Sequence, residues 1–142
     1  MVDDLKGKRT GYGAAFTQLG KGFCVEFPMK DGGARPFAYR LSGPLQPRVC
    51  GVHLKNDYRL AFTARTPHDA DPNLNGYVEV LYVGTRDTRD RTEDVWDIVH
   101  GLFEVENPKT DHLRPPCCEG SLPSMDEAEV QAYMKRLAKF LR

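Results

Sequence analysis

The stretch from residue 49 to residue 86 constrains the fold most, because it has the pattern of three β-strands in succession. Apolar and β-branched residues alternate with polar ones in three segments: 49–54, 58–63 and 77–86. This period of two is typical of strands whose two faces meet different surroundings. Only Lys55-Asn56-Asp57 separates the first two segments. We therefore expect these two strands to form an antiparallel hairpin.

Helical patterns and connectors flank this strand region. Apolar residues recur at helical spacing in three places: within 11–27, over 92–103 and from about residue 124 onward. In the first, Gly20, Gly22 and the β-rich residues 23–27 indicate that the helix ends early or gives way to a strand. Thr92 is the expected N-cap of the second helix, and Ser124 with Glu127 has capping-box spacing at the start of the third. Glycine, proline and polar residues mark three connectors: 28–47, with a short extended piece over 37–41, then 65–76 and 104–123.

Length and composition favour one domain of mixed class. The 142 residues are 40% hydrophobic and 28% charged, with 20 basic and 20 acidic side chains. This predicts a soluble, globular chain with a single core, and its zero net charge disfavours chain-wide binding of nucleic acid. We expect an α/β (α+β) fold, a small, mostly antiparallel sheet packed on helices. The single domain would span 1–142, with a core over 35–103 and a C-terminal extension and helix over 104–142.

The cysteines are interpreted from the expected location. The N-terminal charges are followed by no apolar run, and no apolar stretch approaches the ~20 residues of a membrane span. We therefore expect a cytoplasmic protein, whose four cysteines would be free thiols. Those cysteines are Cys24, Cys50, Cys117 and Cys118. A disulfide between the two adjacent cysteines would need strained geometry and is not expected.

Three side chains of the strand region suggest a phosphate site. Leu60 and Phe62 have the pattern of core residues, and alternation then places Arg59 on the opposite, open face. Arg86 stands where the third strand ends, and His53 lies one hairpin strand away from Arg59. Guanidinium groups bind phosphate oxygens in a planar, bidentate manner, and an imidazole can move a proton near neutral pH. If the three side chains converge, they form a small cationic site.

The same segments, in this order, resemble the RelE/ParE superfamily of bacterial type II toxins. The resemblance covers roughly residues 35–100, about half the chain. The residues that carry it are Leu41-Ser42-Gly43-Pro44-Leu45, Val52-His53-Leu54, Tyr58-Arg59-Leu60-Ala61-Phe62 and Val80-Leu81-Tyr82-Val83-Gly84-Thr85-Arg86.

The resemblance implies a toxin that cuts ribosome-bound messenger RNA without a metal ion. The ribose 2′-hydroxyl would attack the adjacent phosphate, with Arg59 and Arg86 steadying the negative charge that develops. His53 falls where ribonuclease members often carry a lysine, and it would transfer the proton. Further RNA or phosphate contacts would come from Arg48, Lys55 and Arg89. The implied partners are an antitoxin protein, the ribosome and messenger RNA, with no membrane, metal or other cofactor.

Two alternatives remain open. The tyrosine expected a few residues after Arg86 is absent, with Thr92 at about that position, and the chain is neutral where the family is usually basic. Both departures favour a non-catalytic inhibitor on the same fold that binds a host enzyme such as DNA gyrase. A weaker alternative is a zinc-stabilised binding domain with His112, Cys117 and Cys118 as ligands, although adjacent cysteines suit one metal ion poorly.

Overall fold

The computed structural model describes residues 17–19, 21–65, 77–87, 89, 93–108, 115–119 and 123–142. Of the polar loop predicted over 65–76, Arg65 belongs to a strand, and the rest lies outside these residues, as does the candidate zinc ligand His112. Residues 17–19 are helical, within the segment where the first helix is expected.

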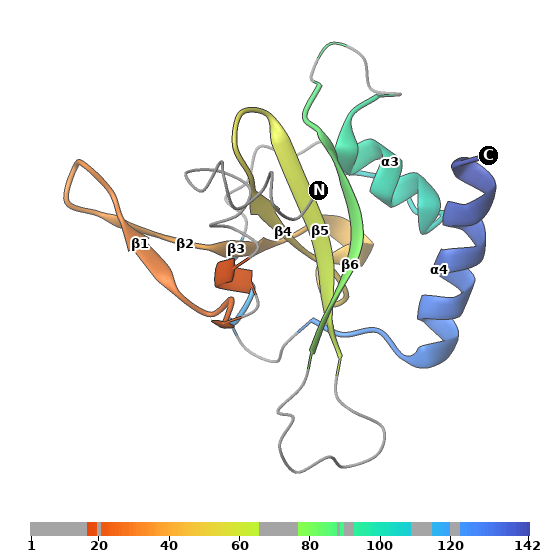
Figure 1. Ribbon diagram of the computed structural model, residues 1–142, viewed down its shortest axis with the longest axis horizontal. Helices are drawn as coiled ribbons and strands as arrows, with labels where there is room; N and C mark the ends of the chain where they lie inside the picture. The colour runs from red at the N-terminus through yellow and green to blue at the C-terminus, as the bar shows by residue number, and fades with distance from the viewer. Residues whose placement is uncertain are drawn as a thin grey trace.

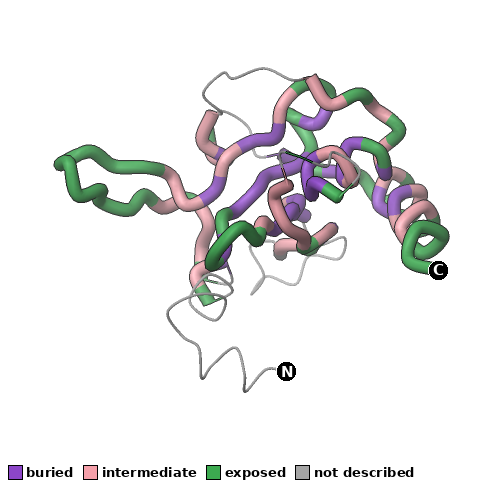
Figure 2. The backbone as a smooth tube through the Cα atoms, turned by 90° about the horizontal axis from the view of Figure 1, so that it is seen from above, coloured by how far each residue is buried: buried purple, intermediate pink, exposed green. Residues whose placement is uncertain are grey.

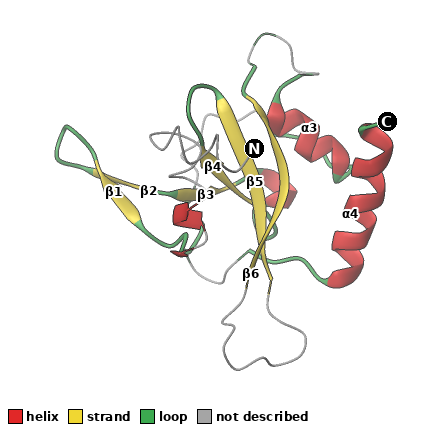
Figure 3. Cartoon of the chain, viewed as in Figure 1, coloured by secondary structure: helices red, strands yellow, loops and turns green. Residues whose placement is uncertain are grey.

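A four-stranded antiparallel sheet forms the centre of the protein, with strand order β3-β4-β5-β6 (Figures 1 and 3). Its strands are β3 (Ala38–Arg40), β4 (Cys50–His53), β5 (Tyr58–Arg65) and β6 (Tyr77–Thr85). The predicted strands are confirmed to within about two residues at their ends. The hairpin between β4 and β5 is also confirmed, and Asn56 supplies its turn with a left-handed φ of 60°.

A second, two-stranded sheet occupies part of the segment that the sequence predicted as a connector. Strands β1 (Glu26–Pro28) and β2 (Ala34–Pro36) form a hairpin that projects from the rest of the molecule (Figure 1). Its surface is mostly exposed (Figure 2). Asp31-Gly32-Gly33 forms the turn, and the Gly32 φ of 90° suits glycine.

Two helices are described after the sheet, and each has an aspartate as its N-cap. Helix α3 (Val95–Leu102) is capped by Asp94, whose side chain accepts a hydrogen bond from the Trp96 backbone N–H, so the prediction of Thr92 as the N-cap is wrong. Helix α4 (Glu127–Phe140) starts with a capping box between Asp126 and Glu129, so the prediction of a capping box at Ser124 is wrong. Asp126 offers the same acceptor chemistry two residues later. The described residues therefore form an α+β fold with antiparallel sheets.

Both faces of the central sheet are covered by apolar side chains. On one face, residues such as Leu41, Ala61 and Leu81 pack against α3 and α4. On the other, Leu60 and Phe62 pack with the N-terminal segment and Cys117. The expectation that Arg59 lies on an open face therefore holds only at the end of its strand, because Ala61 on the same face is buried. Figure 2 shows the buried residues concentrated along the sheet.

One edge of the sheet is covered by the segment over 115–119. The Arg40 backbone N–H donates to the Pro115 carbonyl, and the Cys117 N–H donates to the Ala38 carbonyl, both at 2.9 Å. Tyr39 also forms an antiparallel bridge with Pro116. These contacts bring the adjacent cysteines beside β3.

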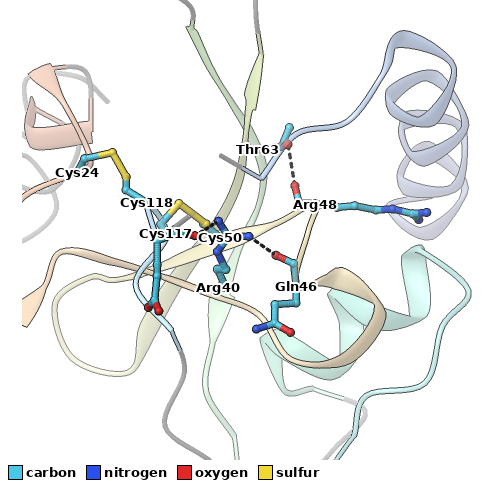
Figure 4. Close-up of a disulfide and its surroundings, with 9 residues drawn as sticks. Cys24, Arg40, Gln46, Arg48, Cys50, Thr63, Cys117 and Cys118 are labelled. Carbon is cyan, nitrogen blue, oxygen red and sulfur yellow. Dashed lines mark hydrogen bonds between the residues drawn. A yellow bond between two sulfur atoms is a disulfide. The ribbon is translucent and has the colours of Figure 1, made fainter. Parts of the chain in front are cut away.

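The four cysteines form two disulfides, so the prediction of free thiols is wrong (Figure 4). Cys24 is bonded to Cys118 and Cys50 to Cys117, with Cα–Cα distances of 5.6 and 5.8 Å that are ordinary for disulfides. The adjacent cysteines are not bonded to each other, as expected. A sulfur in a disulfide is not a thiolate ligand, which removes Cys117 and Cys118 from the zinc alternative.

Tyr133 of α4 joins the helix to the sheet by a hydrogen bond. It should also make the free energy of unfolding decrease at alkaline pH. Its buried hydroxyl donates to the Leu81 carbonyl at 2.8 Å. Burial raises the pKa of Tyr133 above its ordinary value, and the nearby Tyr82 raises it further. In the unfolded chain this tyrosine ionises above about pH 10, while in the folded protein it stays neutral.

We therefore expect the stabilising effect of a neutral Tyr133 to be complete below about pH 10 and to be lost as the pH rises further. Urea unfolding of wild type and Tyr133→Phe at a series of pH values tests this. At pH 7 the variant should be less stable by about 1 to 2 kcal/mol, because the Leu81 carbonyl loses its donor. Above pH 10 the gap should shrink, and two parallel curves would contradict the assignment.

Candidate functional site at one end of the sheet

His53, Arg59 and Arg86 lie at the same end and on the same face of the sheet. His53 ends β4 and is the direct cross-strand partner of Arg59 in β5. Arg59 is in turn the partner of Gly84 in β6, and Arg86 follows Gly84 by two residues. Its backbone N–H donates to the Asp57 carbonyl at 2.7 Å, which continues the ladder beyond β6. Because cross-strand partners share a face and residues alternate along a strand, the three side chains start from one surface.

His53 is an exposed imidazole supported by aromatic rings. Its ring meets Tyr39 edge to face, with 5.2 Å between the ring centroids. Tyr39 meets Trp96 of α3 in the same manner at 6.2 Å. Helix α3 lies this close because β4 has a glycine here, and a Cβ on Gly51 would stand 2.7 Å from the Trp96 ring. The ring of Tyr39, itself packed on Trp96, thus contacts the imidazole from one side, and His53 remains exposed to solvent.

Arg59 keeps its charge unneutralised. Its Nη1 donates to the backbone carbonyls of Asn56 and Tyr58 at 3.4 and 2.9 Å, both in or next to the hairpin turn. These acceptors are neutral, and no carboxylate in the described part of the chain forms an ion pair with it. The side chain is half-buried. It is therefore a positioned guanidinium that can still bind an anion.

Arg86 is held by a buried carboxylate. Its Nη1 lies 2.6 Å from Oδ1 of Asp94, which is 1% exposed. The Asp94 oxygens also accept hydrogen bonds from the backbone N–H groups of Asp87 and Trp96, at 2.7 and 3.2 Å. Arg86 thus neutralises the carboxylate that caps α3 and joins this helix to the end of β6. The sequence predicted two phosphate-binding arginines; among the described residues, Arg86 pairs with a carboxylate, whereas the partners of Arg59 are neutral carbonyls.

The three weaker candidates lie in different places. Lys55 is exposed in the turn that follows His53, so it belongs to the same end of the sheet. Arg89 is exposed beyond Arg86, and its backbone N–H donates to the Asp87 carboxylate at 3.0 Å. Arg48 precedes β4 and so lies at the opposite end of this strand from His53. Its Nε is 3.1 Å from Glu129 of α4.

Sequence reasoning missed the two residues that organise this site, Asp94 and Tyr39. Asp94 had a visible signal, because an aspartate directly before an apolar helical stripe is a strong N-cap candidate. Tyr39 had none, since its contact with His53 depends on how β3 pairs with β4.

Comparisons with known proteins assign this chain to no family. No protein-family model, no curated protein and no solved structure matches this chain. Within the described residues, no three histidine, cysteine, aspartate or glutamate side chains gather as ligands for a metal ion. None of the helices described is long and apolar enough to cross a membrane.

Proposed function

We propose that the protein is a RelE/ParE-like toxin that cuts ribosome-bound messenger RNA. One observation carries the proposal: His53 and Arg59 are direct cross-strand partners at an accessible end of the sheet. An imidazole thus stands beside a guanidinium whose partners among the described residues are neutral backbone carbonyls. This pairing suits a phosphodiester, which needs a proton acceptor near the attacking oxygen and a cation near the phosphate.

The proposed reaction is attack of the ribose 2′-oxygen on the adjacent phosphodiester. The imidazole of His53 accepts the 2′-hydroxyl proton as this oxygen bonds to phosphorus. The bond from phosphorus to the 5′-oxygen breaks, and that oxygen takes a proton. The products are a 2′,3′-cyclic phosphate and a 5′-hydroxyl end. The Arg59 guanidinium binds the equatorial phosphate oxygens, whose negative charge grows in the transition state.

In this proposal Arg86 is a positioning residue. Its contact with Asp94 fixes the end of β6 against the start of α3, which fixes the surface on which Arg59 stands. Lys55 and Arg89 are exposed on nearby segments. They would contact phosphates farther along the RNA.

Mapping of messenger RNA ends in a translating extract tests the proposal. Wild-type protein should produce new ends, and Arg59→Ala should reduce cutting by about 100-fold or more, as loss of one charge-stabilising group does in other enzymes. His53→Gln should also reduce it strongly. Lys135→Ala, which removes an exposed cation on α4, should cut like wild type. A wild type that arrests growth without producing new ends would contradict the nuclease proposal.

A second candidate is a non-catalytic inhibitor that binds a host enzyme such as DNA gyrase. The Arg86–Asp94 ion pair favours it, because it leaves fewer free cations for a phosphate. The outer strand β6 also exposes two apolar side chains, Val80 and Val83. This candidate expects a His53→Gln/Arg59→Ala double variant to arrest growth as wild type does. Failure of the wild type to recover a stoichiometric host partner would count against it.

The toxin proposal includes a cytoplasmic location and an antitoxin partner, since ribosomes are the target and the producing cell needs protection. The cytoplasm keeps most thiols reduced, and disulfides persist mainly in oxidising compartments. The two disulfides therefore count against the cytoplasmic part of this proposal.

A further inference from the structure

The two disulfides differ sharply in how easily a solvent thiol can reach them. Cys50 and Cys117 are each 1% exposed, inside the core on one face of the sheet. Cys24 is exposed, and its partner Cys118 is partly buried (Figure 4). Thiol–disulfide exchange needs direct attack of a thiolate on a sulfur atom, so access decides which bridge reacts. Only the Cys24–Cys118 bridge meets this requirement.

A cavity of about 250 Å³ lies beside this outer bridge, and both of its cysteines line the cavity wall. Apolar side chains, including Phe23, Val25 and Pro116, form much of the remaining wall. The space is large enough for a thiol of a few heavy atoms. Such a molecule would be held against the disulfide when it enters.

The charges at this cavity favour a positively charged thiol. Glu26 and Glu119 line it, and none of the described residues that line it is basic. Arg40, which is 9% exposed, donates through Nη2 to the Glu119 backbone carbonyl at 2.6 Å. Arg40 is thus hydrogen-bonded to the backbone of the residue next to Cys118, and it is not among the lining residues. Both glutamates are exposed.

We propose that the Cys24–Cys118 disulfide is a thiol-exchange site that selects small cationic thiols. The incoming thiolate bonds to Sγ of Cys24, and the bond to Sγ of Cys118 breaks. Cys118 leaves as a thiolate and takes a proton from water. The small thiol is oxidised to a mixed disulfide, Cys118 is reduced, and Cys50–Cys117 stays intact. This inference does not depend on the proposed function.

Exchange kinetics on the purified, oxidised protein test the proposal. The probes are cysteamine, which is cationic, and 2-mercaptoethanesulfonate, which is anionic, compared at equal thiolate concentration. Alkylation and peptide mass mapping at successive times should show the mixed disulfide on Cys24 before any change at Cys50 or Cys117. The rate ratio of cationic to anionic thiol should exceed the ratio measured on the urea-unfolded protein by about fivefold, since two carboxylates attract the cation.

Two controls keep the result decisive. A Glu26→Gln/Glu119→Gln variant changes only exposed side chains and should return the rate ratio towards the value of the unfolded chain. Raising the salt concentration on the wild type should narrow the ratio in the same direction. The proposal is overturned if the inner bridge opens first, if the mixed disulfide forms on Cys118, or if the folded and unfolded ratios are equal.

Discussion

Replacing both Cys50 and Cys117 with alanine should lower the free energy of unfolding by about 3 to 4 kcal/mol, measured by urea unfolding at pH 7. The bridge closes a loop of 67 residues, so its loss frees a large part of the unfolded chain. Both sulfur atoms are also buried in the core, and the smaller alanines leave unfilled space there. The Cys24–Cys118 bridge restricts part of the same chain and limits the loss.

The matched control is the Cys24→Ala/Cys118→Ala variant, which removes the outer bridge. Its Cys24 side chain is exposed, so the variant should lose the stabilisation from loop closure with little loss of packing, and it should retain a cooperative transition. An inner-bridge variant as stable as wild type would contradict the role of Cys50–Cys117. So would the finding of four alkylatable thiols in the native protein under oxidising conditions.

The second large effect is expected at Asp94, where Asp94→Ala should cost about 3 to 5 kcal/mol of unfolding free energy. The substitution removes the α3 N-cap, leaves the Asp87 and Trp96 N–H groups without their acceptor, and deprives Arg86 of its counter-ion. Each of these losses is destabilising, and they occur together at a buried position.

Two variants separate the parts of this effect. Asp94→Asn keeps a side-chain oxygen that can cap α3 but loses the charge, so it should lose less than Asp94→Ala. Glu93→Ala alters an exposed neighbour and should change stability by less than about 0.5 kcal/mol. An Asp94→Ala protein within about 1 kcal/mol of wild type would show that the ion pair and cap contribute little to stability.

The Arg86–Asp94 pair also decides which variants can test activity. An Arg86→Ala variant leaves Asp94 as a buried carboxylate without its cation, so it is expected to be destabilised. A loss of activity in that variant would not distinguish misfolding from lost phosphate binding. Arg59 is the better probe because its contacts are to backbone carbonyls of the adjacent turn.

The strands and the relation between His53 and Arg59 could be predicted because their signals are local. A period of two in the apolar pattern locates β4, β5 and β6, and a three-residue turn joins the first two. With the turn this short, little freedom remains in the register. Strand β2 and its pairing with β1 were missed because Pro28 and Pro36 end the two strands, and proline in a segment argues against a strand.

The disulfides could not be predicted because they depend on contacts between distant parts of the chain. They join residues 94 and 67 positions apart. Nothing local to Cys117 and Cys118 shows that the segment runs beside β3. The ion-pair partner of Arg86 could not be predicted for another reason. Arg86 is followed by several acidic residues, and only the buried position of Asp94 selects it among them.

The chemical nature of the RNA ends tests the central claim most directly, namely that His53 and Arg59 act together on a phosphodiester. RNA cut by the wild type in a translating extract should carry 2′,3′-cyclic phosphates and 5′-hydroxyls, and both should disappear with Arg59→Ala while that variant remains folded. Ends with 5′-phosphates, or undiminished cutting by folded Arg59→Ala, would contradict the account.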